Sequence, residues 1–412
     1  MGFRIRERKL DSLFDPPRET FESRLDITGF ASSIRHTLQP MASLNSTPPG
    51  VNVYGYLHAA SGVGQHTRLL IRALESAKVP FGAQAYLRTT SPQTVPFRTS
   101  EIRKRFPISI VGVNADQTAA FFEDHDLPSD EYKVGLWAWE TEDFPASMAR
   151  HAAHLDEIWA NSGFSAAAIS RKVDIPVFPF PLPIEEPAFT PLDRRDLGLS
   201  EDFLFLFCFD FDSVFTRKNP ISVVRAFRSA FGTSNPKTQL LIKAINGDRH
   251  EDHRSRLVSE IEQTPGCHYL EENLSLEKQH GLIGLCDCYV SLHRSEGFGL
   301  TLAEAMALGK PVIATAYSGN LDYMDHGISE LIGYRYAPVG PDGGPYAKTS
   351  RWAEPDINHA SRAMRRIRDQ PAYARRLGAL ARARVLAQHG LSARGQWIAQ
   401  RLAQIQSGES AA

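Results

Sequence analysis

The stretch SEGFGLTLAEAMALGKPVIATAYSGN, from Ser295 to Asn320, predicts a glycine-rich turn, a helix and a buried strand. The apolar segment CYVSLH directly before it predicts a strand, and the run TLAEAMAL consists mainly of strong helix formers. Gly309 suits the left-handed position that ends a helix, and Pro311 prevents the helix from continuing. The turn therefore follows a strand, and parallel α/β sheets bind ligands at the carboxyl ends of their strands.

Two glutamates in this stretch, Glu296 and Glu304, are separated by seven residues that include the turn. The backbone N–H groups that open the helix favour a phosphate, because the helix dipole adds to them. They belong to Gly297, Phe298, Gly299 and Leu300. A carboxylate beside a phosphate is unfavourable unless it accepts hydrogen bonds from hydroxyl groups, which sugars supply. The pattern predicts a nucleotide sugar; alternatively, Glu296 neighbours a helix cap and Glu304 faces solvent.

Short apolar segments alternate with helical or turn signals on both sides of a proline-rich segment from Val177 to Ser200. Strands that alternate with helices indicate parallel sheets. We therefore expect an α/β protein of two Rossmann-like domains that face each other across a central cleft, joined by the proline-rich linker. The expected parts are an N-terminal extension, a first Rossmann-like domain, a second Rossmann-like domain and a last helical segment: residues 1–50, 51–183, 184–388 and 389–412.

The composition excludes several classes of protein. The chain has 412 residues, 42% of them hydrophobic, and a formal net charge of −1, so no overall field favours nucleic acid. Its four cysteines lie among apolar residues, which predicts reduced core thiols and no zinc site. No secretory signal is evident, so we expect a cytoplasmic location. The basic segment IRKRF at residues 102–106 is a candidate for contact with the membrane surface.

The segment from Ser295 to Thr315 resembles the E-x(7)-E signature of the retaining family 4 glycosyltransferases, which have the GT-B fold. The resemblance covers most of residues 51–400 and is strongest in the second half. It implies that Glu296 contacts the donor sugar, that Glu304 holds the ribose, and that amides of the turn contact the sugar and diphosphate. It also implies a hexosyltransferase without a cofactor, whose partners are a nucleotide sugar and a glycan or glycolipid acceptor. In that family, the first domain is the acceptor domain, the second is the nucleotide-sugar domain, and the last helix crosses back to the acceptor domain. Because no Asp-x-Asp motif of the metal-dependent transferases is evident apart from DFD at residues 210–212, which we expect to be structural, we expect no divalent metal.

The basic residues expected to bind the diphosphate differ from the pattern of this family. Its members carry an Arg and, five residues later, a Lys after the first strand of the second domain. Lys218 fits the Lys position, but Ser213 stands at the Arg position. A diphosphate needs roughly two cations or equivalent donors. We expect Lys218 to act in catalysis with Arg217 or Lys243 as the second cation, although Arg217 could instead be a solvated loop residue.

The first domain offers weaker candidates. Gly62 and Gly64 lie between a strand and a helix, where glycine lets the backbone approach the donor phosphate or simply forms a tight turn. The segment GLWAWETEDFP resembles the W-x-W-E segment of a subset that builds bacterial polysaccharides. Glu140 replaces a His of the wider family and is our third catalytic candidate. The acceptor-binding candidates, each of which could equally serve packing or structure, are Trp139, Asp116 and His58.

Two other functions are compatible with these features. The Ser at position 213 suggests a catalytically silent scaffold or sensor that binds a nucleotide sugar. A sugar-nucleotide epimerase of similar fold is the other, although the E-x(7)-E segment matches transferases better. Turnover of a nucleotide sugar distinguishes an enzyme from a silent binder.

Overall fold

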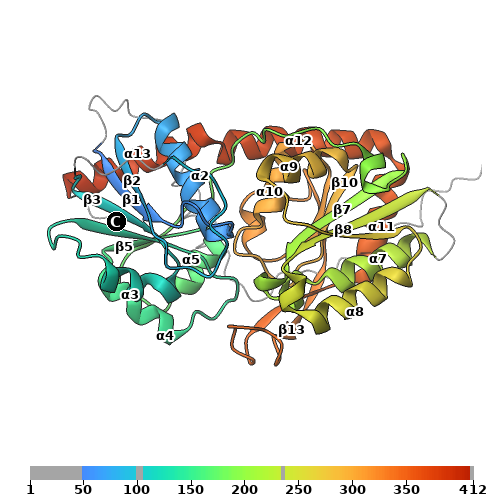
Figure 1. Cartoon of the computed structure of the whole chain (residues 1–412), viewed down its shortest axis with the longest axis horizontal. Helices are drawn as coiled ribbons and strands as arrows, with labels where there is room; N and C mark the ends of the chain where they lie inside the picture. The colour runs from blue at the N-terminus through green and yellow to red at the C-terminus, as the bar shows by residue number, and fades with distance from the viewer. Residues whose placement is uncertain (1–48, 99–104, 233–236, 409–412) are drawn as a thin grey trace, which may run out of the picture. The chain divides into compact units, whose positions relative to one another are not determined.

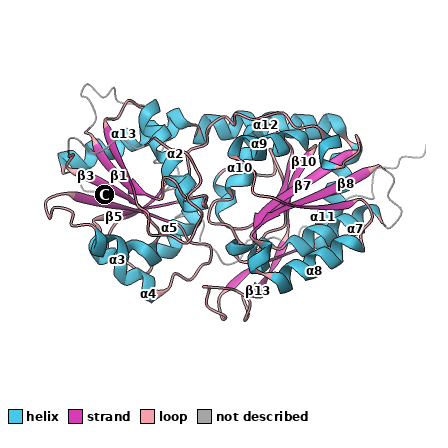
Figure 2. Cartoon of the chain, in the orientation of Figure 1, coloured by secondary structure: helices cyan, strands magenta, loops and turns pink. Residues whose placement is uncertain are grey.

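The computed structural model describes residues 49–98, 105–232 and 237–408. The expected N-terminal extension therefore lies outside the described residues except at its last two positions, and so does most of the basic segment 102–106. The described chain forms two six-stranded sheets and a two-stranded hairpin (Figure 1). Helices cover both faces of each large sheet (Figure 2).

The first sheet is parallel throughout, with the strand order β2-β1-β3-β4-β5-β6. Its strands are β1 (Val51–Gly55), β2 (Phe81–Ala85), β3 (Ile108–Gly112), β4 (Tyr132–Trp137), β5 (Glu157–Ala160) and β6 (Val177–Pro179). Its helices are α2 (Gly62–Ser76), α3 (Ala115–Asp124), α4 (Ala146–Ala149) and α5 (Gly163–Ser170). Val53, Ile110 and Val134 are fully buried, as expected for strands covered on both faces.

Strand β6 corrects one prediction from the sequence. Its three residues were expected to begin the interdomain linker, but they pair in parallel with β5. Pro176 and Pro179 made this segment resemble a loop. An edge strand tolerates proline because one of its sides forms no ladder hydrogen bonds, so the linker prediction was wrong for these residues.

The second sheet is also parallel, with the order β12-β11-β10-β7-β8-β9. Its strands are β7 (Phe203–Asp210), β8 (Thr238–Ile245), β9 (Cys267–Glu271), β10 (Cys288–Ser291), β11 (Val312–Thr315) and β12 (Glu330–Ile332). The helices between them are α6 (Phe215–Lys218), α7 (Pro220–Phe231), α8 (Glu251–Glu262), α9 (Leu276–Leu285) and α10 (Leu300–Ala307). The chain runs outward from β7 to β9 and then returns to β10 beside β7. The strand order reverses there, and such a switch point is where α/β sheets bind ligands.

A hairpin that the sequence analysis did not predict follows the second sheet. It pairs β13 (Tyr334–Pro338) with β14 (Arg351–Pro355) in antiparallel fashion. Three helices complete the chain: α11 (Ile357–Asp369), α12 (Pro371–His389) and α13 (Leu391–Ser407).

Helix α13 packs against α2 of the first domain. Trp397 contacts Trp159 and Phe180, with ring centroids 5.0 Å apart in both pairs. Arg401 forms an ion pair of 2.5 Å with Glu157, and both side chains are buried. The last helix is therefore joined to the first sheet by aromatic packing and by a buried charge pair.

Replacing Arg401 with alanine should lower the free energy of unfolding by about 3–5 kcal/mol, because Glu157 would remain buried without its counter-charge. Urea denaturation followed by tryptophan fluorescence measures the loss. Arg195→Ala is the control, because its pair with Asp193 is exposed and screened by solvent and should contribute little to stability. Equal, small losses in both variants would contradict the role of the buried pair.

Candidate active site

The two glutamates of the opening stretch lie where β10 gives way to α10. Glu296 is in the turn and Glu304 is in the helix, and each residue is 7% exposed. Glu304 therefore does not face solvent, and the turn lies at the switch point between β7 and β10. Buried carboxylates need partners, and those of the two glutamates differ.

Glu296 is held by both cations that follow β7. Lys218 Nζ lies 2.5 Å from one carboxylate oxygen, and Arg217 Nη1 lies 3.2 Å from the other. Burial alone would raise the pKa of Glu296, but Lys218, Arg217 and His293 lower it to about 2. Burial lowers the pKa of Lys218, against the attraction of Glu296. The structure thus brings together three predicted site residues, of which Arg217 and Glu296 are buried and Lys218 is partly exposed. They are here called the charge cluster (Arg217, Lys218 and Glu296).

Arg217 is 5% exposed and also donates to the backbone oxygen of Ser295 at 2.9 Å. It is therefore a buried residue of the charge cluster and not a solvated loop residue. Ser213 ends the short turn after β7. Lys243 lies elsewhere: it is buried in β8, and its Nζ donates to Gln279 Oε1 at 3.2 Å. Arg217 is thus the better placed candidate for the second cation.

The turn depends on its glycines. Gly299 has φ of +85°, a conformation that side chains disfavour. A Cβ on Gly297 would lie 2.7 Å from Asn161 Nδ2 of the first domain, too close for a methyl group. Phe298 is buried against Tyr323, whose hydroxyl donates to the backbone oxygens of Phe298 and Gly299.

The backbone N–H groups of residues 297–300 donate to no acceptor among the described residues. They open α10 and lie directly after the charge cluster in the sequence. Such N–H groups suit an anion. Cations and free amides are therefore both present at this turn.

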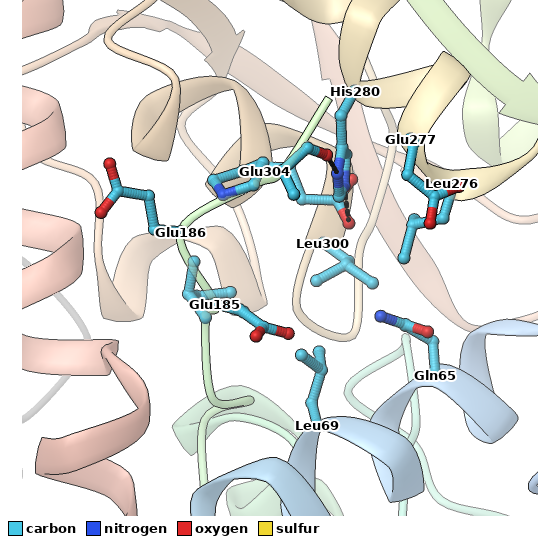
Figure 3. A pocket seen from close by; sticks show the side chains of 12 residues that line it. Gln65, Leu69, Glu185, Glu186, Leu276, Glu277, His280, Leu300 and Glu304 are labelled. Carbon is cyan, nitrogen blue, oxygen red and sulfur yellow. Dashed lines mark hydrogen bonds and ion pairs between the residues drawn. The ribbon is translucent and has the colours of Figure 1, made fainter. Parts of the chain in front are cut away.

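Glu304 lines a second part of the site, a cavity of about 160 Å³ between the two domains. Figure 3 shows it beside His280, whose Nε2 lies 3.4 Å from the Glu304 carboxylate. Burial lowers the pKa of His280, but Glu304, together with the backbone oxygen of Ala188 and the charge of Glu277, outweighs this effect, so the net shift is upward. Gln65 and Leu69 of α2 form another wall. The cavity itself is smaller than the roughly 300–1,000 Å³ of ordinary ligand pockets, so it can enclose only part of a larger ligand.

The turn before α2 places its two glycines differently. A Cβ on Gly62 would meet no atom within 4 Å, whereas one on Gly64 would lie 2.6 Å from the backbone oxygen of Tyr56. The N–H of Gly64 is already bonded to Ser61 Oγ. Gly64 is therefore required by packing, and Gly62 has free space beside it.

Glu140 of the first domain approaches the charge cluster from the opposite side. Its Cγ lies 3.5 Å from where a Cβ on Gly297 would stand, and its backbone oxygen accepts a hydrogen bond from Ser295 Oγ. Tyr346, a residue that the sequence analysis missed, donates to Glu140 Oε2 at 2.9 Å. Glu140 thus adds a second negative charge near Arg217 and Lys218, although both cations pair directly with Glu296.

The predicted acceptor-binding residues are not brought together. Trp139 is 3% exposed and packs against Phe144 and Tyr346. No hydrogen bond or ion pair of the described chain joins Asp116 or His58 to the charge cluster. Asp116 is exposed on α3, and the His58 ring contacts the backbone oxygen of Val95.

Ser318 and Asn320, which follow β11, support the turn that holds Glu296. Ser318 Oγ accepts from the N–H of Glu296 at 2.8 Å. Asn320 Oδ1 lies 3.1 Å from His293 Nε2, and both residues are fully buried.

Residues 49–98, 105–232 and 237–408 contain no group of three or more His, Cys, Asp or Glu that could hold a metal. Over the same residues, no helix is both long and apolar enough to cross a membrane. The four cysteines are free.

Comparison with known proteins agrees with this geometry. Residues 192–339 match the family model described as "Glycosyl transferases group 1". The matched range contains the charge cluster and Glu304. No curated protein sequence matches the chain.

Solved glycosyltransferase structures share the fold. Sucrose-phosphate synthase from Thermosynechococcus elongatus has a TM-score of 0.65 at 17% identity, over 87% of this chain and 100% of that one. HepE from Anabaena, in complex with UDP-glucose, has a TM-score of 0.59 at 14% identity, over 86% and 100% of the two chains. S. aureus TarM, with UDP and alpha-GlcNAc-glycerol, has a TM-score of 0.53 at 12% identity, over 72% and 55%. At these identities the likeness shows the fold, and the expected GT-B architecture of two Rossmann-like domains is confirmed.

Proposed function

We propose that this chain is a retaining hexosyltransferase that moves a sugar from a nucleoside-diphosphate sugar to a hydroxyl acceptor. The observation that carries the proposal is the charge cluster, which lies at the switch point of the second sheet beside the free amides of residues 297–300. The family match over residues 192–339 supports the same class of reaction.

The charge cluster and the turn suit a diphosphate. Lys218 and Arg217 are both paired with Glu296, so a bound diphosphate would compete with that carboxylate for the two cations. Once released, Glu296 can accept hydrogen bonds from hydroxyls of the donor sugar. Glu304, in the neighbouring cavity, can accept hydrogen bonds from the ribose.

In the proposed reaction, the bond between the anomeric carbon and the phosphate oxygen breaks. The acceptor oxygen bonds to the same face of that carbon, and its proton passes to the leaving phosphate. Lys218, Arg217 and the turn amides stabilise the charge on the departing diphosphate. Because these groups supply the positive charge, we propose that no divalent metal is needed.

We propose a glycan or glycolipid acceptor, and UDP sugars are the first donors to test. HepE in complex with UDP-glucose and TarM with UDP and alpha-GlcNAc-glycerol motivate these choices. A role in bacterial polysaccharide assembly is consistent with the W-x-W-E segment that ends at Glu140.

A thermal-shift screen of UDP, GDP and ADP tests the proposal. We expect one of them to stabilise the protein, by about 2.7 kcal/mol at a hundred times its dissociation constant. Turnover of the matching nucleotide sugar is then measured with and without a chelator, which should make no difference. If none of the nucleotides shifts the melting temperature, the proposal is wrong.

One observation favours a second function. Both cations are already paired with Glu296, and Ser213 adds no charge where the resembling family has an Arg. A protein of this kind could bind a nucleotide sugar without transferring it. A thermal shift without any turnover, by hydrolysis or by transfer, would identify such a silent binder.

A further inference from the structure

The unpredicted hairpin and the acidic segment of the first domain meet through a set of side-chain hydrogen bonds. The acidic segment is defined here as residues 140–143, and the hairpin loop as residues 339–350. Three hydroxyl groups donate to three different carboxylates. They are Tyr346 to Glu140 at 2.9 Å, Tyr336 to Glu142 at 3.2 Å and Ser350 to Asp143 at 2.8 Å.

The hairpin loop is also attached to the segment that carries the cations. Thr216, the residue before Arg217, donates through Oγ1 to the backbone oxygen of Asp342 at 2.8 Å. Tyr346 is 6% exposed, and its ring lies edge-on to Trp139 at 5.2 Å. Burial raises the pKa of Tyr346, and the negative charge of Glu140 raises it further, so its hydroxyl stays protonated and able to donate.

Glu140 differs from Glu296 in its partners. Glu296 is paired with two cations, whereas Glu140 forms no ion pair within the described part of the chain. Its single side-chain hydrogen bond there comes from the neutral hydroxyl of Tyr346. A neutral donor fixes the carboxylate in place and leaves its negative charge uncompensated by direct contact.

We propose that Tyr346 is a positioning residue that holds the Glu140 carboxylate toward the donor sugar when the domains are closed. This inference rests on the proposed function. A negative charge fixed beside Gly297 stabilises the positive charge that develops at the anomeric carbon as the diphosphate leaves. The hydrogen bond joins one domain to the other, so opening the domains for donor entry releases Glu140 and closing them places it again.

Tyr346→Phe tests the proposal because it removes one hydroxyl and keeps the packed ring. Tyr336→Phe is the matched control, since its hydroxyl belongs to the same hairpin and bonds to Glu142 instead. The substrate is whichever of UDP-, GDP- or ADP-glucose the wild-type protein turns over. We expect Tyr346→Phe to lower kcat about 10- to 100-fold, with KM for the donor changed less than about twofold. The control should stay within about twofold of wild type.

The same measurement in a Glu140→Gln background separates positioning from folding. If Tyr346 acts through Glu140, adding Tyr346→Phe to that variant should cause little further loss of kcat. Equal losses in both tyrosine variants, a change in KM alone, or the same loss with and without Glu140 would overturn the proposal. Absence of turnover in the wild-type protein would instead reject the proposed function.

Discussion

Replacing Glu296 with glutamine is expected to abolish sugar transfer and, at the same time, to tighten the binding of the free nucleoside diphosphate. In the structure, Lys218 and Arg217 are both paired with this carboxylate. A diphosphate must compete with Glu296 for them. Glutamine removes the competing charge and leaves both cations for the phosphates, but it is a poorer partner for donor hydroxyls in the transition state.

We expect the turnover of Glu296→Gln to fall at least about 100-fold, as when one group that stabilises a transition state is lost. The dissociation constant of the nucleoside diphosphate should fall about three- to tenfold, a gain of roughly 1 kcal/mol. Isothermal titration calorimetry measures binding, and product release measures turnover. Glu354→Gln is the control, because Glu354 pairs with Arg294 in the same domain. Weaker diphosphate binding by Glu296→Gln would show that the ion pairs do not compete with the ligand.

The pKa of Glu296 sets the pH range for this comparison. Its pKa is lowered from its ordinary value of 4.5 to about 2. A lowered pKa means that the ionised form stabilises the fold above about pH 4.5 and that this contribution is lost as the pH falls toward 2. Glu296 therefore stays ionised throughout the neutral range. Binding measured there compares a fully charged carboxylate in the wild-type protein with a neutral amide in Glu296→Gln.

The local part of the site could be predicted from sequence. Glu296 and Lys218 lie in the segments that follow β10 and β7, and Glu304 lies in the helix that the turn opens. In a parallel sheet, a strand end and the turn after it determine where such residues lie. Arg217 was harder to place, because two neighbouring basic residues in a short helix can face either way. The structure shows that both contact the same carboxylate.

The interdomain part could not be predicted. Tyr346 and Glu140 are 206 residues apart in the sequence, so no pattern within a short stretch of sequence could predict their contact. The hairpin that carries Tyr346 has two five-residue strands with mixed burial. The alternation of apolar and polar residues that would reveal a strand in the sequence is therefore weak there. Trp139 shows the opposite difficulty: an aromatic side chain at a strand end suggested sugar binding, but its ring is buried between Phe144 and Tyr346.

Replacing Lys218 with methionine should weaken diphosphate binding, the opposite of the effect expected for Glu296→Gln. Methionine keeps much of the side chain's length but leaves Arg217 as the one cation paired with Glu296 within the described ranges. Because Glu140 also lies nearby, the local charge then becomes negative, and a diphosphate is repelled. We expect its dissociation constant to rise about 100-fold, close to 2.7 kcal/mol. Turnover should fall about 1,000-fold, because the same cation stabilises the leaving group.

The double variant Lys218→Met/Glu296→Gln separates charge from structural damage. Removing both partners restores a balanced local charge, so diphosphate affinity should return to between those of the two single variants. Lys243→Met serves as the control, since Lys243 donates to Gln279 and forms no ion pair with Glu296 among the described residues. It should weaken binding less than Lys218→Met does. If Lys243→Met has the larger effect, Lys243 and not Arg217 is the second cation of the diphosphate site. If the double variant binds as poorly as Lys218→Met, competition between Glu296 and the diphosphate for Lys218 is not what controls affinity.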